Sequence, residues 1–160
     1  MGLEAARHFV RLDAQKLILA VRSVPKGQEA KSSIETSTKR LDVVEVWELD
    51  LNSYASVKAF AERAKGLERL DVVIENAAVF KFDHAMAEDN EQSVTVNVVS
   101  TFLLALLLLP KLRETANRFG KSPVLTFTGS FTHALAKFPE RKKKNILVEM
   151  NKREASLKER

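Results

Sequence analysis

The sequence predicts a doubly wound α/β fold, in which helices cover both faces of a parallel sheet. Stretches with the helical spacing of apolar residues alternate with short apolar stretches along the chain. The short stretches at 16–21 and 70–75 are continuously apolar, as in parallel strands that are buried on both faces. The chain has 160 residues, of which 45% are hydrophobic, and this is enough for a single domain over 1–160 with a core of its own.

The expected elements of the first half begin with a helix over 2–12, where apolar residues recur on one helical face. A strand over 16–21 follows this helix. Pro25 suits the first turn of the next helix, which we expect at about 26–37. Residues 43–49 alternate well enough to form the second strand.

The second half begins with a helix that Asn52 or Ser53 can cap, since both side chains accept hydrogen bonds from a first helical turn. Strands and helices continue to alternate after it. In chain order they are a strand at 70–75, a long apolar helix from about 88 to 112 that ends near Pro110, a strand at 124–128 and a helix from about 146 onward.

Composition narrows the class of protein. The chain has no cysteine, so it has neither disulfides nor a thiolate metal site, and no metal is expected. The net charge of +5 comes from the last third, around the run 141–144, but no aromatic residues are interleaved there. We therefore expect a solvated loop and no nucleic-acid partner. The apolar run at 102–109 is too short to span a bilayer, and the charged first turns do not form a signal peptide. These features predict a cytoplasmic protein without a membrane partner.

Polar residues stand at the ends of the expected strands. Asp50 follows the second strand, Asn76-Ala77-Ala78 follows the third, and Ser130 closes the run 126–130 after the fourth. Together with Asn97, which lies inside the long apolar helix, they resemble the motifs of the short-chain dehydrogenase/reductase family in its fungal form. The resemblance implies a Rossmann-like fold, a nicotinamide cofactor and hydride transfer between alcohols and ketones.

The resemblance assigns four residues to cofactor binding, of which the first three are Gly2, Arg22 and Asp50. Gly2 matches the last glycine of the family's T-G-x-x-x-G-x-G turn, and Arg22 lies 20 residues later at the end of the next strand. An acid at that place binds the ribose 2′-hydroxyl of NAD, whereas an arginine accommodates the 2′-phosphate of NADP. We therefore expect NADP rather than NAD. The alternative is that Arg22 is an ordinary exposed arginine after a strand. Asp50 matches the family's acid that contacts the adenine side of the cofactor. The alternative is an ordinary acid at a strand end, which stabilises a nearby helix N-terminus.

Asn76 matches the asparagine of the family's N-A-G turn, another cofactor-binding element. Ala78 stands where the family has glycine. If this turn requires a positive φ or a close approach of the backbone, the Cβ of Ala78 would strain it. The fit of a cofactor at Asn76 therefore depends on the backbone of Ala78.

Two residues match catalytic positions of the family. The family's counterpart of Asn97 organises a water molecule and the catalytic lysine. A buried amide also needs partners on physical grounds alone, so local backbone is the alternative. Ser130 matches the second of two serines, whose hydroxyl binds the substrate oxygen, and Gly129 replaces the first.

The family's proton donor is a tyrosine, with a lysine four residues later. The only tyrosine of the chain is Tyr54, and Lys58 follows it at that spacing. In the family the pair follows the catalytic serine, whereas Tyr54 precedes Ser130 by 76 residues. We therefore expect Tyr54 to be a surface or staple residue of its helix.

The resemblance thus implies a partial dinucleotide-binding domain over 1–160, truncated at both ends. It lacks the family's first strand, its C-terminal strands and its tyrosine–lysine pair. In the order 3-2-1-4-5-6 this leaves at best a displaced 3-2-4-5 sheet.

The function that follows is an NADP-dependent oxidoreductase of secondary metabolism that acts on a small-molecule alcohol or carbonyl compound. A homo-oligomer is allowed. The alternative is a non-catalytic remnant or interaction module. A third alternative is a basic nucleic-acid binder, which is supported only by the run of basic residues at 141–144.

Overall fold

The computed structural model describes residues 1–80 and 83–152. The chain divides into two compact units, Met1–Asp50 and Leu51–Arg160, and each is described by itself. The expectation of a single domain stays a prediction.

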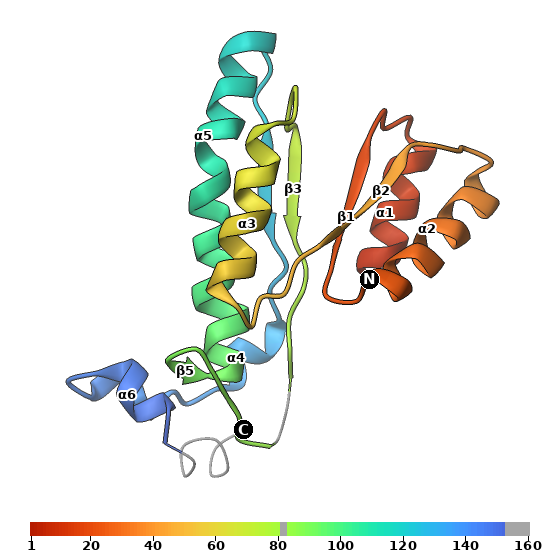
Figure 1. The fold of residues 1–160 in the computed structure, drawn as a ribbon. Helices are drawn as coiled ribbons and strands as arrows, with labels where there is room; N and C mark the ends of the chain where they lie inside the picture. Colours follow the sequence, from red (N-terminus) through yellow and green to blue (C-terminus); the bar gives the residue numbers. More distant parts are fainter. Residues whose placement is uncertain (81–82, 153–160) are drawn as a thin grey trace. The chain divides into compact units, whose positions relative to one another are not determined.

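The first unit consists of two helices and two parallel strands (Figure 1). In chain order these are α1 (Gly2–Arg11), β1 (Leu17–Val21), α2 (Val24–Thr38) and β2 (Val44–Glu48). Strands β1 and β2 pair from Leu17 opposite Val44 to Val21 opposite Glu48. All four elements agree with the ranges expected from the sequence to within a few residues.

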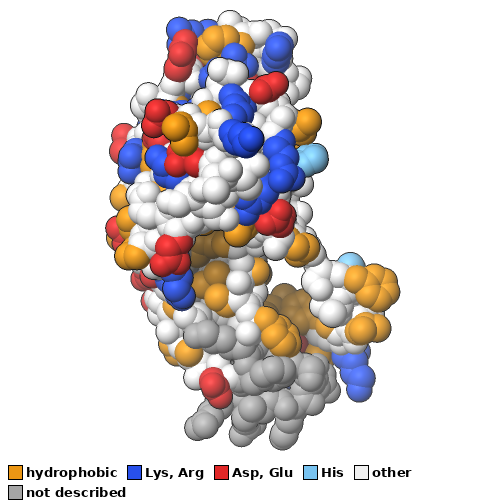
Figure 2. Space-filling view, turned by 90° about the vertical axis from the view of Figure 1, so that its right-hand side faces the viewer, with side chains coloured by type: hydrophobic (Ala, Val, Ile, Leu, Met, Phe, Trp, Pro, Cys, Tyr) orange, Lys and Arg blue, Asp and Glu red, His pale blue; other side chains and the backbone are white. Residues whose placement is uncertain are grey.

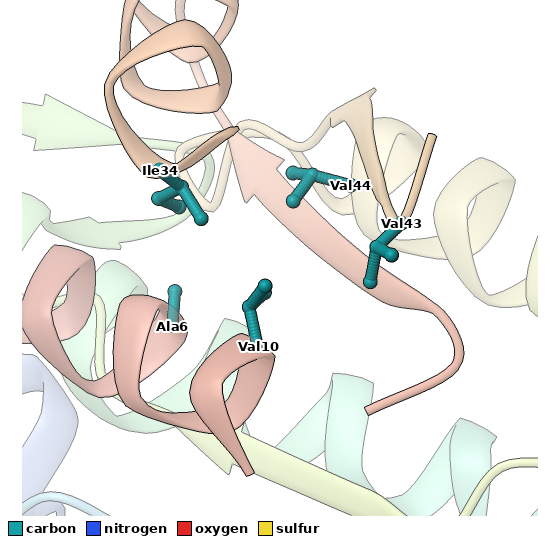
Figure 3. Close-up of a cluster of buried hydrophobic side chains, with 5 residues drawn as sticks. All are labelled: Ala6, Val10, Ile34, Val43 and Val44. Carbon is teal, nitrogen blue, oxygen red and sulfur yellow. The ribbon is translucent and has the colours of Figure 1, made fainter. Parts of the chain in front are cut away.

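The core of this unit lies between its helices and strands. Ala6 and Val10 of α1, Ile34 of α2, and Val43 and Val44 at the start of β2 point toward one another (Figure 3). Val10 and Ile34 are completely buried. Burial of such side chains contributes roughly 1.5–3 kcal/mol each, so these residues hold the helices onto the strand pair.

The second unit pairs β3 (Val72–Glu75) with β6 (Val124–Phe127), again in parallel. Helices α3 (Tyr54–Lys65) and α5 (Thr101–Phe119) lie side by side next to the strands (Figure 1). Ser53 caps α3, since its Oγ accepts a hydrogen bond of 3.3 Å from the Ser56 N–H. The expected cap and helix are therefore confirmed.

Short elements complete the second unit. A small antiparallel hairpin, which the sequence did not reveal, joins the third strand to the long helix. In chain order these elements are β4 (Met86–Ala87), β5 (Asn90–Glu91), α4 (Gln92–Val94), a π-helical turn η1 (Thr95–Ser100), two 3-10 helices η2 (Phe131–Leu135) and η3 (Pro139–Lys142), and α6 (Ile146–Met150). The expected helix from 146 onward is confirmed only over α6, and its continuation beyond 152 lies outside the described residues.

The expected end of the long helix near Pro110 was wrong. Helix α5 continues through Pro110 to Phe119, where Gly120 adopts a positive φ of 65° and ends it. A proline inside a helix lacks the N–H that would bond to the carbonyl four residues earlier. That carbonyl belongs to Leu106, which is 63% exposed, so water can solvate it.

The run from Gln92 to Phe119 has the length and apolar composition of a membrane-crossing helix, and 44% of its most apolar window is buried inside the protein. Core helices of soluble proteins have the same composition. In α5 the side chains of Leu104, Leu108 and Leu112 are buried. The expected absence of a membrane partner stays a prediction.

Both parallel strand pairs of the expected 3-2-4-5 sheet form. Strands β1 and β2 pair in the first unit, and β3 and β6 pair in the second. The strand order across the two units stays a prediction.

Candidate functional site

The first group of predicted site residues lies at one end of the first unit. Arg22 directly follows β1, and Asp50 follows β2. The two strands end side by side, because the Leu49 N–H donates a hydrogen bond of 2.9 Å to the Val21 carbonyl. Gly2 begins α1, which runs opposite to β1, so it lies at the same end (Figure 1). The structure therefore gathers Gly2, Arg22 and Asp50 at the carboxyl edge of the β1–β2 pair.

This edge has the donors that an anionic ligand requires. The Arg22 side chain is exposed and makes no ion pair within the described residues. The backbone N–H groups at the start of a helix such as α1 also favour anions. Asp50 is half-buried and has an interaction partner. An arginine guanidinium binds phosphate through charge-assisted hydrogen bonds, so the residues present fit the phosphate of a nucleotide.

The second group lies at the carboxyl edge of the β3–β6 pair. Asn76 follows β3, and Ser130 follows β6 after a two-residue extension. The strands remain paired up to this point, because the Thr128 N–H donates a hydrogen bond of 2.9 Å to the Glu75 carbonyl. Asn76 is half-buried and Ser130 is exposed. The two residues thus leave the same edge of the same strand pair, as the sequence predicts.

The Ser130 hydroxyl makes local hydrogen bonds at the start of η2. Its Oγ accepts a hydrogen bond of 3.2 Å from the Thr132 N–H and lies 2.7 Å from the Thr132 Oγ1. The Ser130 carbonyl lies 2.6 Å from the Nδ1 of His133. A hydroxyl has one donor and two acceptor positions, so these bonds fix the position of Oγ while the group stays open to solvent.

Asn97 binds backbone that is distant in the sequence. Its Oδ1 accepts a hydrogen bond of 2.8 Å from the Val79 N–H, and its Nδ2 donates one of 2.8 Å to the Val79 carbonyl. The expectation that a polar residue in this apolar helix has hydrogen-bond partners is confirmed. Asn97 lies in η1, and π-helical turns occur frequently at functional sites. The structure therefore connects the segment after β3 to the long helix.

The two departures from the family pattern do not strain the backbone. Ala78 is exposed and does not adopt a positive φ. A Cβ added at Gly129 would meet no atom within 4 Å, so a serine there would fit without a shift. Strain from a positive φ at Ala78 is therefore absent, and the fit of a cofactor at this turn stays a prediction.

Tyr54 is the first residue of α3 and holds the β4–β5 hairpin. Its N–H donates a hydrogen bond of 2.7 Å to the Glu88 carboxylate, and its hydroxyl accepts one of 3.4 Å from Asn90. Nearby, Gln92 donates a hydrogen bond of 2.6 Å to Asn52. These contacts give Tyr54 the role of a staple between a helix start and a hairpin.

Glu75 is a titratable residue that the sequence reasoning did not select. It ends β3, its side chain is buried, and its Oε1 accepts no hydrogen bond from the described residues. Burial penalises the charged form and raises the pKa of Glu75 from 4.5 to about 7. The signal in the sequence is an acid at the end of a continuously apolar stretch, directly before Asn76.

Comparison with known proteins assigns the fold. A family model described as short chain dehydrogenase matches residues 1–121. Among solved structures, a short-chain dehydrogenase from Sphingobium yanoikuyae in complex with NADPH aligns with a TM-score of 0.63, at 18% identity, over 96% of this chain and 56% of its own. The NADH-dependent reductase A1-R′ complexed with NAD aligns with a TM-score of 0.66, at 17% identity, over 97% of this chain and 61% of its own. Such likenesses show the fold, and the predicted doubly wound α/β class with an incomplete parallel sheet is confirmed.

Two fungal proteins are similar in sequence. The short chain dehydrogenase/reductase dmxR8 of Cryptosporiopsis sp. (strain 8999) is 52% identical over 88% of this chain and 44% of its own length. The short chain dehydrogenase atnD of Emericella nidulans is 46% identical over 100% of this chain and 52% of its own length. The chain thus spans about half the length of the curated relatives that it matches. The chain belongs to the short-chain dehydrogenase/reductase family of oxidoreductases.

Proposed function

We propose that this chain is part of an NADP-dependent oxidoreductase that interconverts alcohol and carbonyl groups of a small molecule in secondary metabolism. The observation that carries the proposal is the second group of site residues. Asn76 and Ser130 leave the same edge of the β3–β6 pair, and Asn97 binds the segment between β3 and the hairpin. The setting in secondary metabolism rests on the resemblance to the fungal form of the family.

The residues have distinct roles in this proposal. The nicotinamide cofactor supplies the hydride when it is bound. Ser130 donates a hydrogen bond from its hydroxyl to the substrate oxygen, where negative charge develops as a carbonyl is reduced. Asn97 holds the segment after Asn76 in place through Val79. Asn76 borders the cofactor at the end of β3.

In this proposal Tyr54 is not the proton donor. Tyr54 begins α3 and bonds to Asn90, so it acts as a staple. In the family the donor tyrosine follows the catalytic serine. We expect the 160-residue chain by itself to lack turnover, because it has no other tyrosine.

The choice of NADP rests on Arg22. The fold accepts both cofactors, since one structural neighbour holds NADPH and another holds NAD. Arg22 is exposed at the end of β1, where a guanidinium reaches a 2′-phosphate. NADP, a small-molecule substrate, a cytoplasmic location and the absence of nucleic-acid and membrane partners all belong to the proposal. A homo-oligomer is allowed by it.

The experiment is an Arg22→Asp substitution with NADP and NAD titrated separately by calorimetry. A charge-assisted bond to phosphate is worth roughly 1.5–3 kcal/mol, so the Kd for NADP should rise about tenfold to a hundredfold. The Kd for NAD should change by no more than about twofold, because NAD lacks the 2′-phosphate. Arg113→Asp, at an exposed position of α5, is the control for charge. Equal weakening of both cofactors, or no binding by the unmodified chain, would contradict the proposal.

A second candidate function is a non-catalytic interaction module. It is favoured by the outer face of the β3–β6 pair, where Val72, Ile74 and Val124 are 43%, 38% and 53% exposed. Apolar surface of this kind marks contact sites. Stable association of the chain in sedimentation experiments, without binding of either cofactor, would favour this candidate.

A further inference from the structure

Arg7 is the one charged residue of the first unit that is buried, and the structure describes that unit throughout. On the face drawn in Figure 2, Lys and Arg side chains in blue and Asp and Glu side chains in red lie on the surface, where water solvates their charges. The Arg7 side chain, in contrast, is only 10% exposed. A buried charge is costly unless it is paired and hydrogen-bonded, so the partners of Arg7 indicate what it does.

The guanidinium of Arg7 is anchored on α2. Its Nη1 donates a hydrogen bond of 2.8 Å to the Ser33 carbonyl and another to the Ser37 Oγ. Its Nη2 donates one of 3.1 Å to the Ser33 Oγ. A guanidinium is planar and its donors have a fixed geometry, so several bonds to one neighbouring helix also fix its orientation. The position of this cation is therefore set by α2 and not only by α1.

The Nε of Arg7 holds the carboxylate of Glu4. It lies 3.3 Å from the Glu4 Oε1 and 3.2 Å from the Oε2, and donates its hydrogen bond to them. The Glu4 side chain is 71% exposed. An ion pair between two exposed side chains of one helix contributes little. Here the cation is buried and anchored, so the pair determines where the Glu4 carboxylate lies.

Glu4 is the third residue of α1, where a carboxylate has a second possible position. The first N–H groups of a helix have no partner inside it. The N–H groups of Glu4 and Ala5 both donate to the Met1 carbonyl at 3.1 Å, which leaves those of Gly2 and Leu3. A glutamate in the third helical position can reach back to the helix start, and negative charge is favoured there. A free Glu4 carboxylate would therefore compete with an anionic ligand for this end of α1.

We propose that Arg7 holds the Glu4 carboxylate away from the start of α1 and so leaves the N–H groups of Gly2 and Leu3 to the diphosphate of a bound nucleotide. This rests on the proposed oxidoreductase function, which places a nucleotide at this edge. Arg7 acts through Glu4 and does not touch the ligand, so it is a positioning residue. NADP and NAD share the diphosphate, so Arg7 should affect both cofactors, whereas Arg22 should affect only NADP.

The test measures the binding of NADP, NAD and inorganic pyrophosphate to the 160-residue chain by calorimetry. Arg7→Met removes the guanidinium, Glu4→Gln removes the charge that it holds, and a double variant combines the two. Lys65→Met is the matched control, because it breaks the pair between Glu62 and Lys65 of α3, which has the same spacing of three residues and an N–O distance of 2.5 Å. Fluorescence of Trp47, which is buried in the first unit, shows whether that unit is folded.

Arg7→Met should raise the Kd for each of the three ligands about fivefold, which is typical of one charge near a helix N-terminus. Glu4→Gln should recover this loss in the Arg7→Met background. In the unmodified chain it should change each Kd by less than about twofold, because Arg7 already holds the carboxylate. A general loss of positive charge would instead give Glu4→Gln the same effect in both backgrounds. Lys65→Met should leave all three Kd values unchanged.

Leu3→Glu is a second variant that leaves Arg7 in place. Leu3 is 41% exposed, so the substitution adds an acid to the same helical turn that no arginine holds. It should raise all three Kd values about fivefold, and it decides the question if Arg7→Met does not fold.

The inference is overturned by unchanged affinities in folded Arg7→Met or in Leu3→Glu, by a double variant that does not recover, or by an unmodified chain that binds none of the three ligands. Cofactor binding without the expected pattern would contradict the role of Arg7 and leave the proposed function standing. Binding of pyrophosphate alone, with the expected pattern, would support the role of Arg7 and contradict the proposed function.

Discussion

Replacing Glu75 by glutamine should remove a pH dependence of stability from the second unit. Glu75 is buried at the end of β3, and its Oε1 has no hydrogen-bond partner among residues 1–80 and 83–152. Burial raises its pKa to about 7 in the folded chain, against 4.5 for the ordinary side chain. Between these two values the folded state holds a proton that the unfolded state has lost. The free energy of unfolding therefore falls as the pH rises from about 4.5 to about 7, and it levels off above.

The size of the effect follows from the pKa shift. Each pKa unit corresponds to about 1.4 kcal/mol, so the shift of about 2.5 units gives a full loss of at most about 3.5 kcal/mol, of which about 2.5 kcal/mol falls between pH 5 and pH 8. Glutamine resembles the protonated acid in shape and carries no charge. Glu75→Gln should therefore be more stable than the unmodified chain at pH 8 and similar to it at pH 5.

Urea unfolding followed by far-ultraviolet circular dichroism at the two pH values measures this difference. Glu68→Gln, at an exposed position of the same unit, is the control and should keep the pH dependence of the unmodified chain. Trp47, the single tryptophan, is buried in the first unit, so its fluorescence reports separately on that unit. Parallel pH profiles for Glu75→Gln and the unmodified chain would refute the reasoning.

Two further substitutions test the packing and the hydrogen bonds of the structure. Gly27→Ala should destabilise the first unit by about 1–3 kcal/mol in a Trp47 fluorescence melt, because its Cβ would lie 2.5 Å from a methyl of Val46. Gly129→Ala, where the Cβ meets nothing, should change stability by less than about 0.5 kcal/mol, and equal effects would contradict the packing argument. Asn97→Ala should destabilise the second unit by about 1–3 kcal/mol in urea unfolding, because both backbone groups of Val79 lose their partner; an unchanged midpoint would contradict that role.

Most of the fold could be predicted from the sequence, because helices and strands each impose their own local spacing on the apolar residues. The prediction placed β1, β2, β3 and β6 to within a few residues. The prediction failed at Pro110. Proline tends to end an isolated helix, but α5 is held by packing over its whole length and continues through it. The prediction also missed the β4–β5 hairpin, whose strands of two residues each are too short to show a period.

The positions of the candidate site residues at the strand ends were predicted for a related reason, while their roles stay predictions. Arg22, Asp50, Asn76 and Ser130 were found because parallel strands bring their carboxyl ends to one edge. The partner of Asn97 could not be found in this way. Its hydrogen bonds join segments that are 18 residues apart, and no local pattern marks the second member of such a pair.

Because of the π-helical turn η1, the hydrogen bonds between Asn97 and Val79 depend on the number of residues in this turn. A π-helical turn has one residue more than an α-helical turn, so the six residues of η1 rotate everything before them relative to α5. Loss of a single residue from this turn would restore a regular helix and lengthen the continuous hydrogen-bond ladder. The same change would swing the Asn97 amide by about 100° around the helix axis, away from the backbone that it binds. The irregularity therefore acts as a fixed angular offset on which the hydrogen bonds between Asn97 and Val79 depend.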